Sequence, residues 1–203
     1  MADNYYIIAQ EGSGIFKEKM SKFLSFAFFV EDAEEAKSKI KQIQNEYHDS
    51  RHVCWAYMLG PERKEWQLND NGEPSGTAGK PILGQINSFG LTNVVVIVVR
   101  YFGGIKLGTP GLIAAYREAA RLALEDAGVK EVHTMKRISF SFPYISSNDV
   151  MKIVKSEEVE VLDRNFDNAC EMTLSFREDF SDRIVSRLLK IPGLSLLEET
   201  SNS

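Results

Sequence analysis

One short apolar run dominates the pattern of hydrophobic and polar positions along the chain. Residues Val94 to Val99 are continuous aliphatic residues, and all of them are β-branched. A run of this length is too short for a helix and is typical of a strand that is covered on both faces. We therefore expect this strand in the middle of a domain, between two Gly-rich turns that lead into helices.

Capping signals predict where the neighbouring helices begin. Ser75 and Thr77 are candidate N-caps for one helix, because their hydroxyl oxygens would accept hydrogen bonds from the free N–H groups of its first turn. Thr109 is the candidate N-cap of the next helix, with Pro110 at its first helical position. An earlier helix is predicted from a capping box formed by Asp32 and Glu35. The predicted helices cover residues 33–48, 78–89 and 110–127.

The remaining apolar segments of the first part predict strands at 5–10, 23–30, 52–60 and 64–68. The segment that contains Gly12 and Gly14 is predicted as a polar connection. After Gly128 the pattern changes to strand, helix, two strands, helix and strand, with a hairpin turn at Asp167-Asn168. This order is that of a ferredoxin-like βαββαβ domain. We predict an α+β protein with domains 1–129 and 130–203.

Composition narrows the classes of function. The net charge of −5 argues against a chain that coats nucleic acid indiscriminately, so any such contact has to come from a local patch. Residues 131–203 hold 9 basic and 13 acidic residues, which places the patch in the first part of the chain. No signal-peptide pattern or membrane span is expected. Two isolated cysteines and three scattered histidines predict no metal, no cofactor and no disulfide framework, and favour the cytoplasm.

Two Gly-rich segments flank the central strand and form the candidate site. GEPSGTAGK lacks the spacing of a P-loop, and GGIKLG does not satisfy G-x-G-x-x-G, so neither nucleotide fingerprint applies. Both segments still allow close backbone approach at helix starts, where N–H groups favour anions. The candidate ligand-binding residues are Glu73, Ser75, Gly76, Thr77, Gly79, Lys80, Arg100, Tyr101, Phe102, Gly103, Gly104, Lys106 and Gly108.

Several of these residues have a second interpretation. The glycines are equally explained by tight turns. Glu73 and His52 form a candidate acid/base pair, although a single histidine beside a strand is more often a hydrogen-bonded structural residue. Cys54 alternates into an apolar strand and is expected to be buried rather than nucleophilic. Tyr101 and Phe102 either stack on bases or partner side chains, or close the hydrophobic end of the strand.

Four motifs resemble the signature of the IMPACT/YigZ family: HVCWAY, DNGEPSGTAGKPIL, LTNVVVIVVRYFGGIKLG and GLIAAY, in this order and at these separations. The resemblance implies an N-terminal domain with the fold of the second domain of ribosomal protein S-five. It also implies a smaller C-terminal domain similar to domain V of elongation factor G, as in bacterial members. Both of these relatives act on ribosomal RNA, and eukaryotic family members are linked to translation control. The chain departs from the pattern at Thr109-Pro110 and Glu118, where many members carry smaller residues.

Together these features predict a non-enzymatic cytoplasmic protein that binds RNA or a ribosome-associated protein in the regulation of translation, without membrane contact. Arg100, Lys106 and Lys80 would then meet phosphate, while Ser75 and Thr77 supply hydroxyl groups. Two alternatives stay open at this level. One is a hydrolase that uses Glu73 and His52, and the other is a protein-binding module without nucleic-acid contact.

Overall fold

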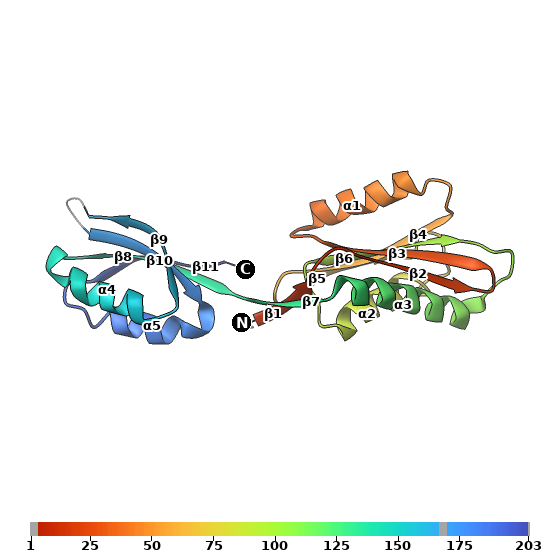
Figure 1. Ribbon diagram of the computed structural model, residues 1–203. Helices are drawn as coiled ribbons and strands as arrows, with labels where there is room; N and C mark the ends of the chain where they lie inside the picture. The colour runs from red at the N-terminus through yellow and green to blue at the C-terminus, as the bar shows by residue number, and fades with distance from the viewer. Residues whose placement is uncertain (1–3, 167–169, 203) are drawn as a thin grey trace. The chain divides into compact units, whose positions relative to one another are not determined.

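A computed structural model describes residues 4–166 and 170–202 of the chain (Figure 1). The chain divides into two compact units. One unit is formed by Tyr5–Val132, and the other by His133–Ser203 together with the first residues of the chain. Each unit has its own hydrophobic core. No helix among the described residues is long and apolar enough to cross a lipid bilayer.

The N-terminal unit is organised around the strand that the apolar run predicts. This strand, β6 (Val94–Tyr101), is the middle strand of a five-stranded sheet with the order β2-β3-β6-β4-β5. It pairs antiparallel with β3 and β4, and residues Val94 to Val99 are completely buried. The expectation of a central strand covered on both faces is confirmed. The other strands are β2 (Gly12–Glu18), β3 (Ser21–Phe29), β4 (His52–Leu59) and β5 (Glu65–Asn69).

Strand β2 corrects the prediction of a polar connection in this region. Its inward positions include Gly12 and Gly14, so the alternation of apolar residues that normally identifies a strand is missing. The glycines are there because helix α3 packs directly on the strand. A Cβ atom on Gly12 would lie 2.2 Å from the carbonyl oxygen of Ala123.

Helices cover both faces of this sheet (Figure 1). α1 (Ala33–Glu46) lies on one face, and α2 (Gly79–Ser88) and α3 (Gly108–Ala127) lie on the other. Alternate residues of β6 therefore enter two separate cores, one on the α1 side and one on the α2/α3 side. α3 ends as predicted at Gly128, which adopts a φ of 66°.

The N-cap predicted from the sequence is found at α1 but not at α2 or α3. The Asp32 carboxylate accepts hydrogen bonds from the N–H groups of Glu34 and Glu35, as the capping box predicts. At α2, neither Ser75 nor Thr77 caps the helix; the Thr77 hydroxyl instead donates to the carbonyl of Pro74. At α3, no side chain caps the helix start, so the prediction for Thr109 is also wrong.

The start of α2 is capped by Asp70, from the turn that follows β5. Its carboxylate accepts hydrogen bonds from the N–H groups of Gly76, Ala78 and Gly79 at 2.8, 3.0 and 2.8 Å. A charged acceptor that reaches across the loop satisfies three donors at once, which a hydroxyl within the loop cannot do. Asp70 therefore fixes the shape of the whole GEPSGTAGK segment.

The Asp70 cap makes stability depend on pH. Burial raises the pKa of Asp70, but the three backbone N–H bonds outweigh it and hold the pKa below its usual value of 3.8. The Asp70 carboxylate stabilises the fold at pH values above its pKa in the unfolded chain. This stabilisation is lost as the pH falls through the lower pKa of Asp70 in the folded protein. Asp70→Asn should flatten the loss of stability below about pH 4, and Asp70→Ala should cost about 1–2 kcal/mol at neutral pH. Urea unfolding across a pH series measures both, and the exposed Ser75→Ala variant should leave stability within about 0.5 kcal/mol.

A two-stranded sheet is formed by β1 (Asn4–Ile8) and β7 (Val129–His133).

The C-terminal unit contains a four-stranded antiparallel sheet with the order β11-β8-β10-β9 and two helices packed against it. The first strand predicted after Gly128 is divided at Thr134 between β7 and β8, and the predicted turn at Asp167-Asn168 lies outside the described residues. Along the chain the elements are β8 (Met135–Phe142), α4 (Ser147–Ser156), β9 (Val159–Asn165), β10 (Cys170–Arg177), α5 (Ser181–Leu188) and β11 (Ser195–Asn202).

Candidate functional site

The two Gly-rich segments meet at one pocket of about 420 Å³, at the end of β6. We call this cavity the β6 pocket. Its walls come from the start of β4, the loop after β5, the end of β6 and the first turn of α3. It brings together six of the residues that the sequence singles out: His52, Glu73, Arg100, Phe102, Lys106 and Gly108.

The other candidate residues lie elsewhere. Gly76 and Lys80 line a second pocket between α2 and α3, which Arg117 also lines, so Lys80 is not beside Arg100. Tyr101 belongs to the core on the α1 side, and its hydroxyl donates to Asp49 at 2.7 Å. Of the two interpretations of this tyrosine, closing the end of the strand agrees with its position.

Three candidates shape the loop before α2. Ser75 is exposed, whereas Thr77 and Gly79 are buried at the helix start. The hydroxyl group of Thr77 and the N–H group of Gly79 already have partners within the protein, Pro74 and Asp70. These two residues therefore hold the loop in place rather than offer free donors.

The two glycines after β6 have different roles. A Cβ atom on Gly103 would lie 2.1 Å from the carbonyl carbon of Met20, so the backbone of the β2–β3 turn packs directly on this residue. Gly104 has a φ of 89° and open space where a Cβ would be. Gly103 therefore serves a close packing contact, and Gly104 serves the conformation of the turn.

A buried ion pair forms the floor of the β6 pocket. Arg100 Nη1 donates to Glu73 Oε1 at 2.6 Å, with side-chain exposures of 7% and 4%. The Tyr116 hydroxyl donates to the same carboxylate oxygen at 2.8 Å. The Arg100 guanidinium also lies over the rings of Phe23 and Phe102, at 5.6 and 5.4 Å from their centres. The end of β6 is thus held in place by an ion pair and two aromatic contacts of Arg100.

This arrangement does not favour Glu73 as a catalytic acid or base. Its carboxylate is buried and already accepts bonds from Arg100 and Tyr116. His52 lies directly opposite Arg100 in the sheet, and its Nδ1 is 2.9 Å from the carbonyl oxygen of Asn71. Because a carbonyl only accepts, Nδ1 carries the proton of this bond. The structural interpretation of His52 agrees with this geometry.

Cys54 is completely buried, as its position in the apolar pattern predicts. Its Sγ lies 2.9 Å from the carbonyl oxygen of Asp70 and 3.3 Å from the Tyr116 hydroxyl oxygen. Burial is the main cause that raises the pKa of Cys54 to about 12. Burial likewise raises the pKa of Tyr116 far above its usual range. Both groups are therefore neutral hydrogen-bonding groups beneath the pocket.

Both thiols should be unreactive in the folded protein. Cys54 is 0% exposed and Cys170 is 3% exposed, so a reagent in solution cannot reach either sulfur atom, and the raised pKa of Cys54 also keeps that thiol in its poorly nucleophilic neutral form. A thiol-specific chromogenic reagent at about pH 8 should modify neither cysteine in native protein, and should modify both after unfolding in urea. Rapid modification of Cys54 in native protein would contradict the burial and the raised pKa.

The rim of the β6 pocket carries positive charge and one exposed aromatic ring. Arg51 and Lys106 are exposed at the rim, and Phe102 is 45% exposed. The sequence interpretation missed three residues of this region. Arg51 lies at the rim, whereas Asp70 and Tyr116 support the pocket from below. Arg51 directly precedes β4, but only the pairing of β4 with β6 shows that its neighbour His52 lies opposite Arg100.

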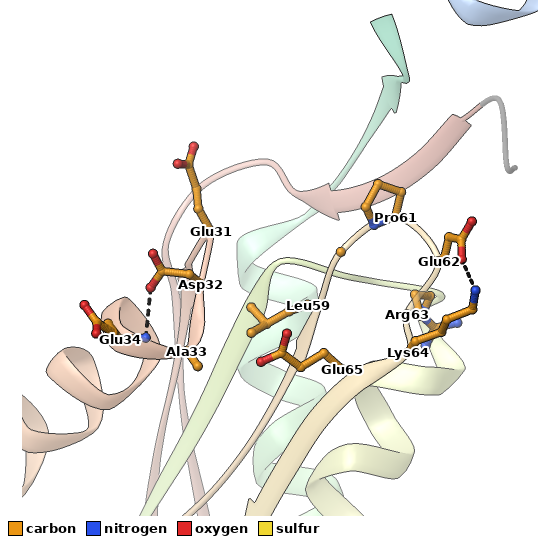
Figure 2. Close-up of a pocket in the computed structure, with 11 residues that line it drawn as sticks. Glu31, Asp32, Ala33, Glu34, Leu59, Pro61, Glu62, Arg63, Lys64 and Glu65 are labelled. Atoms are coloured by element: carbon orange, nitrogen blue, oxygen red, sulfur yellow. Dashed lines mark hydrogen bonds and ion pairs between the residues drawn. The ribbon is translucent and has the colours of Figure 1, made fainter. Parts of the chain in front are cut away.

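Two other pockets have a different electrostatic character. A pocket of about 530 Å³ lies at the far end of β4, where acidic residues such as Glu31, Glu34 and Glu65 surround it (Figure 2). In the C-terminal unit, a pocket of about 360 Å³ is lined by acidic residues and hydroxyl groups. No basic residue is among the described residues that line it. In the described parts of the chain, no three His, Cys, Asp or Glu residues are grouped so that they could hold a metal ion. The β6 pocket is therefore a better candidate for an anionic ligand than either of these two pockets.

Comparison with known proteins relates the chain to a family. The Impact N-terminal domain matches residues 19–124, a range that contains every residue of the β6 pocket. An IMPACT family member from Haemophilus influenzae is 32% identical over 180 residues, which cover 86% of each chain. The IMPACT family member YigZ of Escherichia coli is 41% identical over 108 residues, or 52% of this chain and 53% of that protein.

A solved structure is similar over nearly the whole chain. This crystal structure, described as that of a hypothetical protein, has a TM-score of 0.70 at 25% identity and covers 97% of this chain and 98% of its own. The alignment with the Haemophilus protein likewise extends over most of the chain. The motif-based resemblance is confirmed, and the chain belongs to the IMPACT family.

Proposed function

We propose that this protein binds RNA through the β6 pocket, in the regulation of translation and without catalysis. The observation that carries the proposal is the meeting of both Gly-rich segments at one cavity with a basic rim. Arg51 and Lys106 supply charge there, and Phe102 supplies an exposed ring. Phosphate contacts from basic residues together with stacking on an aromatic ring are the common elements of single-stranded RNA binding.

The charge distribution favours RNA binding at the β6 pocket over binding at other surfaces. The protein as a whole is acidic, with a net charge of −5, and acidic residues outnumber basic ones in the pocket at the far end of β4 and in the pocket of the C-terminal unit. An RNA backbone is repelled from those surfaces and attracted to the basic rim. The Glu73 carboxylate offsets part of the charge of Arg100 and holds its guanidinium in one position at the floor of the pocket.

A salt series tests the proposal. Filter binding of structured and single-stranded RNA should weaken as salt rises, and Lys106→Ala or Arg51→Ala should each lower the slope of log affinity against log salt by about 0.7–0.9. The control is Lys64→Ala, whose side chain is 83% exposed beside the acidic pocket; this variant should bind like the wild type. A flat salt response, or unchanged binding by both rim variants, would rule out phosphate contact.

A ribosome-associated protein partner is the second candidate, and one observation favours it. Met20 is 79% exposed and Ile105 is 48% exposed, on the two loops that meet at Gly103. Exposed apolar side chains near a functional loop are common at protein interfaces. A pull-down with the tagged protein, in which RNA and protein are identified separately with and without nuclease, distinguishes the two partners. The hydrolase alternative has no comparable support, because the Glu73 carboxylate is buried and ion-paired.

The finer fold assignments and the location in the cell belong to the same proposal. We infer a fold like the second domain of ribosomal protein S-five for the first unit, and a ferredoxin-like fold, as in domain V of elongation factor G, for the second. The β8-α4-β9-β10-α5-β11 order and the β11-β8-β10-β9 sheet support the second inference. The free, buried thiols of Cys54 and Cys170 agree with a reducing cytoplasm.

A further inference from the structure

We infer that the β6 pocket recognises a phosphate monoester at the end of an RNA strand. The inference rests on the proposed RNA binding and specifies which part of the RNA enters the pocket. Three features support it: an uncapped helix start, a buried donor without an acceptor, and donors on several walls of one cavity.

The two helix starts beside the Gly-rich segments differ in what satisfies their N–H groups. At α2 the Asp70 carboxylate accepts three backbone hydrogen bonds. At α3 no side chain caps the helix, and its first residues, Gly108 and Thr109, line the β6 pocket. α3 has 20 residues, so its N-terminus carries a partial positive charge that favours an anion. The start of α2 is thus capped by an anionic side chain of the protein, whereas the start of α3 opens onto the β6 pocket.

Arg100 points to an anion independently of the helix. Its side chain is only 7% exposed and lines the pocket. Its Nε is buried and has no hydrogen-bond partner among the described residues. A buried donor without an acceptor is costly, so the hydrogen-bonding capacity of Arg100 at the floor of the pocket is not fully satisfied by the protein.

The placement of the donors favours a terminal phosphate over an internal one. They come from separate walls: β6, the loop with Lys106, the first turn of α3 and the segment at Arg51. An internal phosphodiester continues in both directions and presents only two free oxygens. A monoester is attached on one side, presents three acceptor oxygens and carries a charge of about −1.5 to −2. It enters end-on and reaches the buried Arg100, while the terminal base lies beside Phe102 at the rim.

The test compares short single-stranded RNAs of one sequence that carry a 5′ phosphate, a 3′ phosphate or neither. Fluorescence anisotropy with the full chain should show at least about tenfold tighter binding of one phosphorylated form, the effect of an added charge-assisted hydrogen bond. Thr109→Asp places a carboxylate at the start of α3, as Asp70 does at α2. This variant should lose the preference while its thermal midpoint stays equal or rises, and Thr109→Asn should keep the preference.

Each outcome decides one point. Equal binding of all three RNAs, weakened by Lys106→Ala, overturns the terminal-phosphate inference and leaves the RNA proposal standing. Binding of none of them overturns both. Competition by adenosine monophosphate at the affinity of the phosphorylated RNA assigns the pocket to a free nucleotide and overturns the RNA end as its ligand. A preference that Thr109→Asp does not change places the phosphate elsewhere and also overturns the inference.

Discussion

Replacement of Glu73 by alanine is expected to lower the free energy of unfolding by about 3–5 kcal/mol. The substitution leaves the Arg100 guanidinium buried without its counter-charge, since the side chain of Arg100 is 7% exposed and that of Glu73 is 4% exposed. It also removes the acceptor of the Tyr116 hydroxyl group, which is itself completely buried. Urea unfolding at neutral pH, followed by circular dichroism, measures the loss.

Two further variants distinguish the stability cost of an unpaired buried charge from the cost of removing a carboxylate in general. Glu73→Gln combined with Arg100→Met removes both charges, keeps an acceptor oxygen for the Tyr116 hydroxyl group, and should recover much of the lost stability because no buried charge is left unpaired. Glu62→Ala breaks the exposed ion pair with Lys64 and should leave the stability nearly unchanged. If Glu73→Ala costs no more than Glu62→Ala, the ion pair does not stabilise the pocket floor as we describe.

Replacement of Gly103 by alanine is expected to destabilise the protein by about 3 kcal/mol. The added Cβ would lie 2.1 and 2.2 Å from the carbonyl carbon and oxygen of Met20 and 2.5 Å from the Ser21 nitrogen. These are backbone atoms of the β2–β3 turn, so no side chain can rotate to make room. The turn has to move away from the end of β6, and RNA binding at the β6 pocket should weaken with it.

Gly104 in the same loop provides the matched control. Its Cβ would meet nothing within 4 Å, but its φ of 89° strains any other residue, so Gly104→Ala should cost only about 1 kcal/mol. Thermal unfolding of the two variants should therefore differ clearly. Equal stability of Gly103→Ala and Gly104→Ala would show that the turn accommodates a side chain and that the close packing at Gly103 is not essential.

Some elements could be predicted because their signals are local. The run from Val94 to Val99 has only one favourable environment, a strand buried on both faces, and β6 occupies it. The cap at Asp32 and the end of α3 at Gly128 depend on atoms within a few residues along the chain. The burial of Cys54 follows from its alternation within β4. In each case the signal that identifies the structure lies within a few neighbouring residues of the sequence.

The candidate site was predicted in part. The sequence places His52, Glu73, Arg100, Phe102, Lys106 and Gly108 in or beside the two Gly-rich segments and two strands, and the pocket joins all six. It does not predict that Lys80 lies in another pocket, because that depends on the direction in which α2 leaves the loop. Nor does it predict the role of Asp70, because the acceptor and its donors are separated by a turn.

The sequence alone determined the central strand, the helical segments, the family and the regions from which a site could be built. The tertiary structure decided that β2 is a strand, that Asp70 caps α2, and that Glu73 pairs with Arg100. Each of these rests on contacts between segments far apart in the chain: α3 against Gly12, the β5 turn against α2, and Glu73 against β6. Close approach and buried charge have their energetic effect only after the sheet has formed, so no pattern of neighbouring residues can encode them by itself.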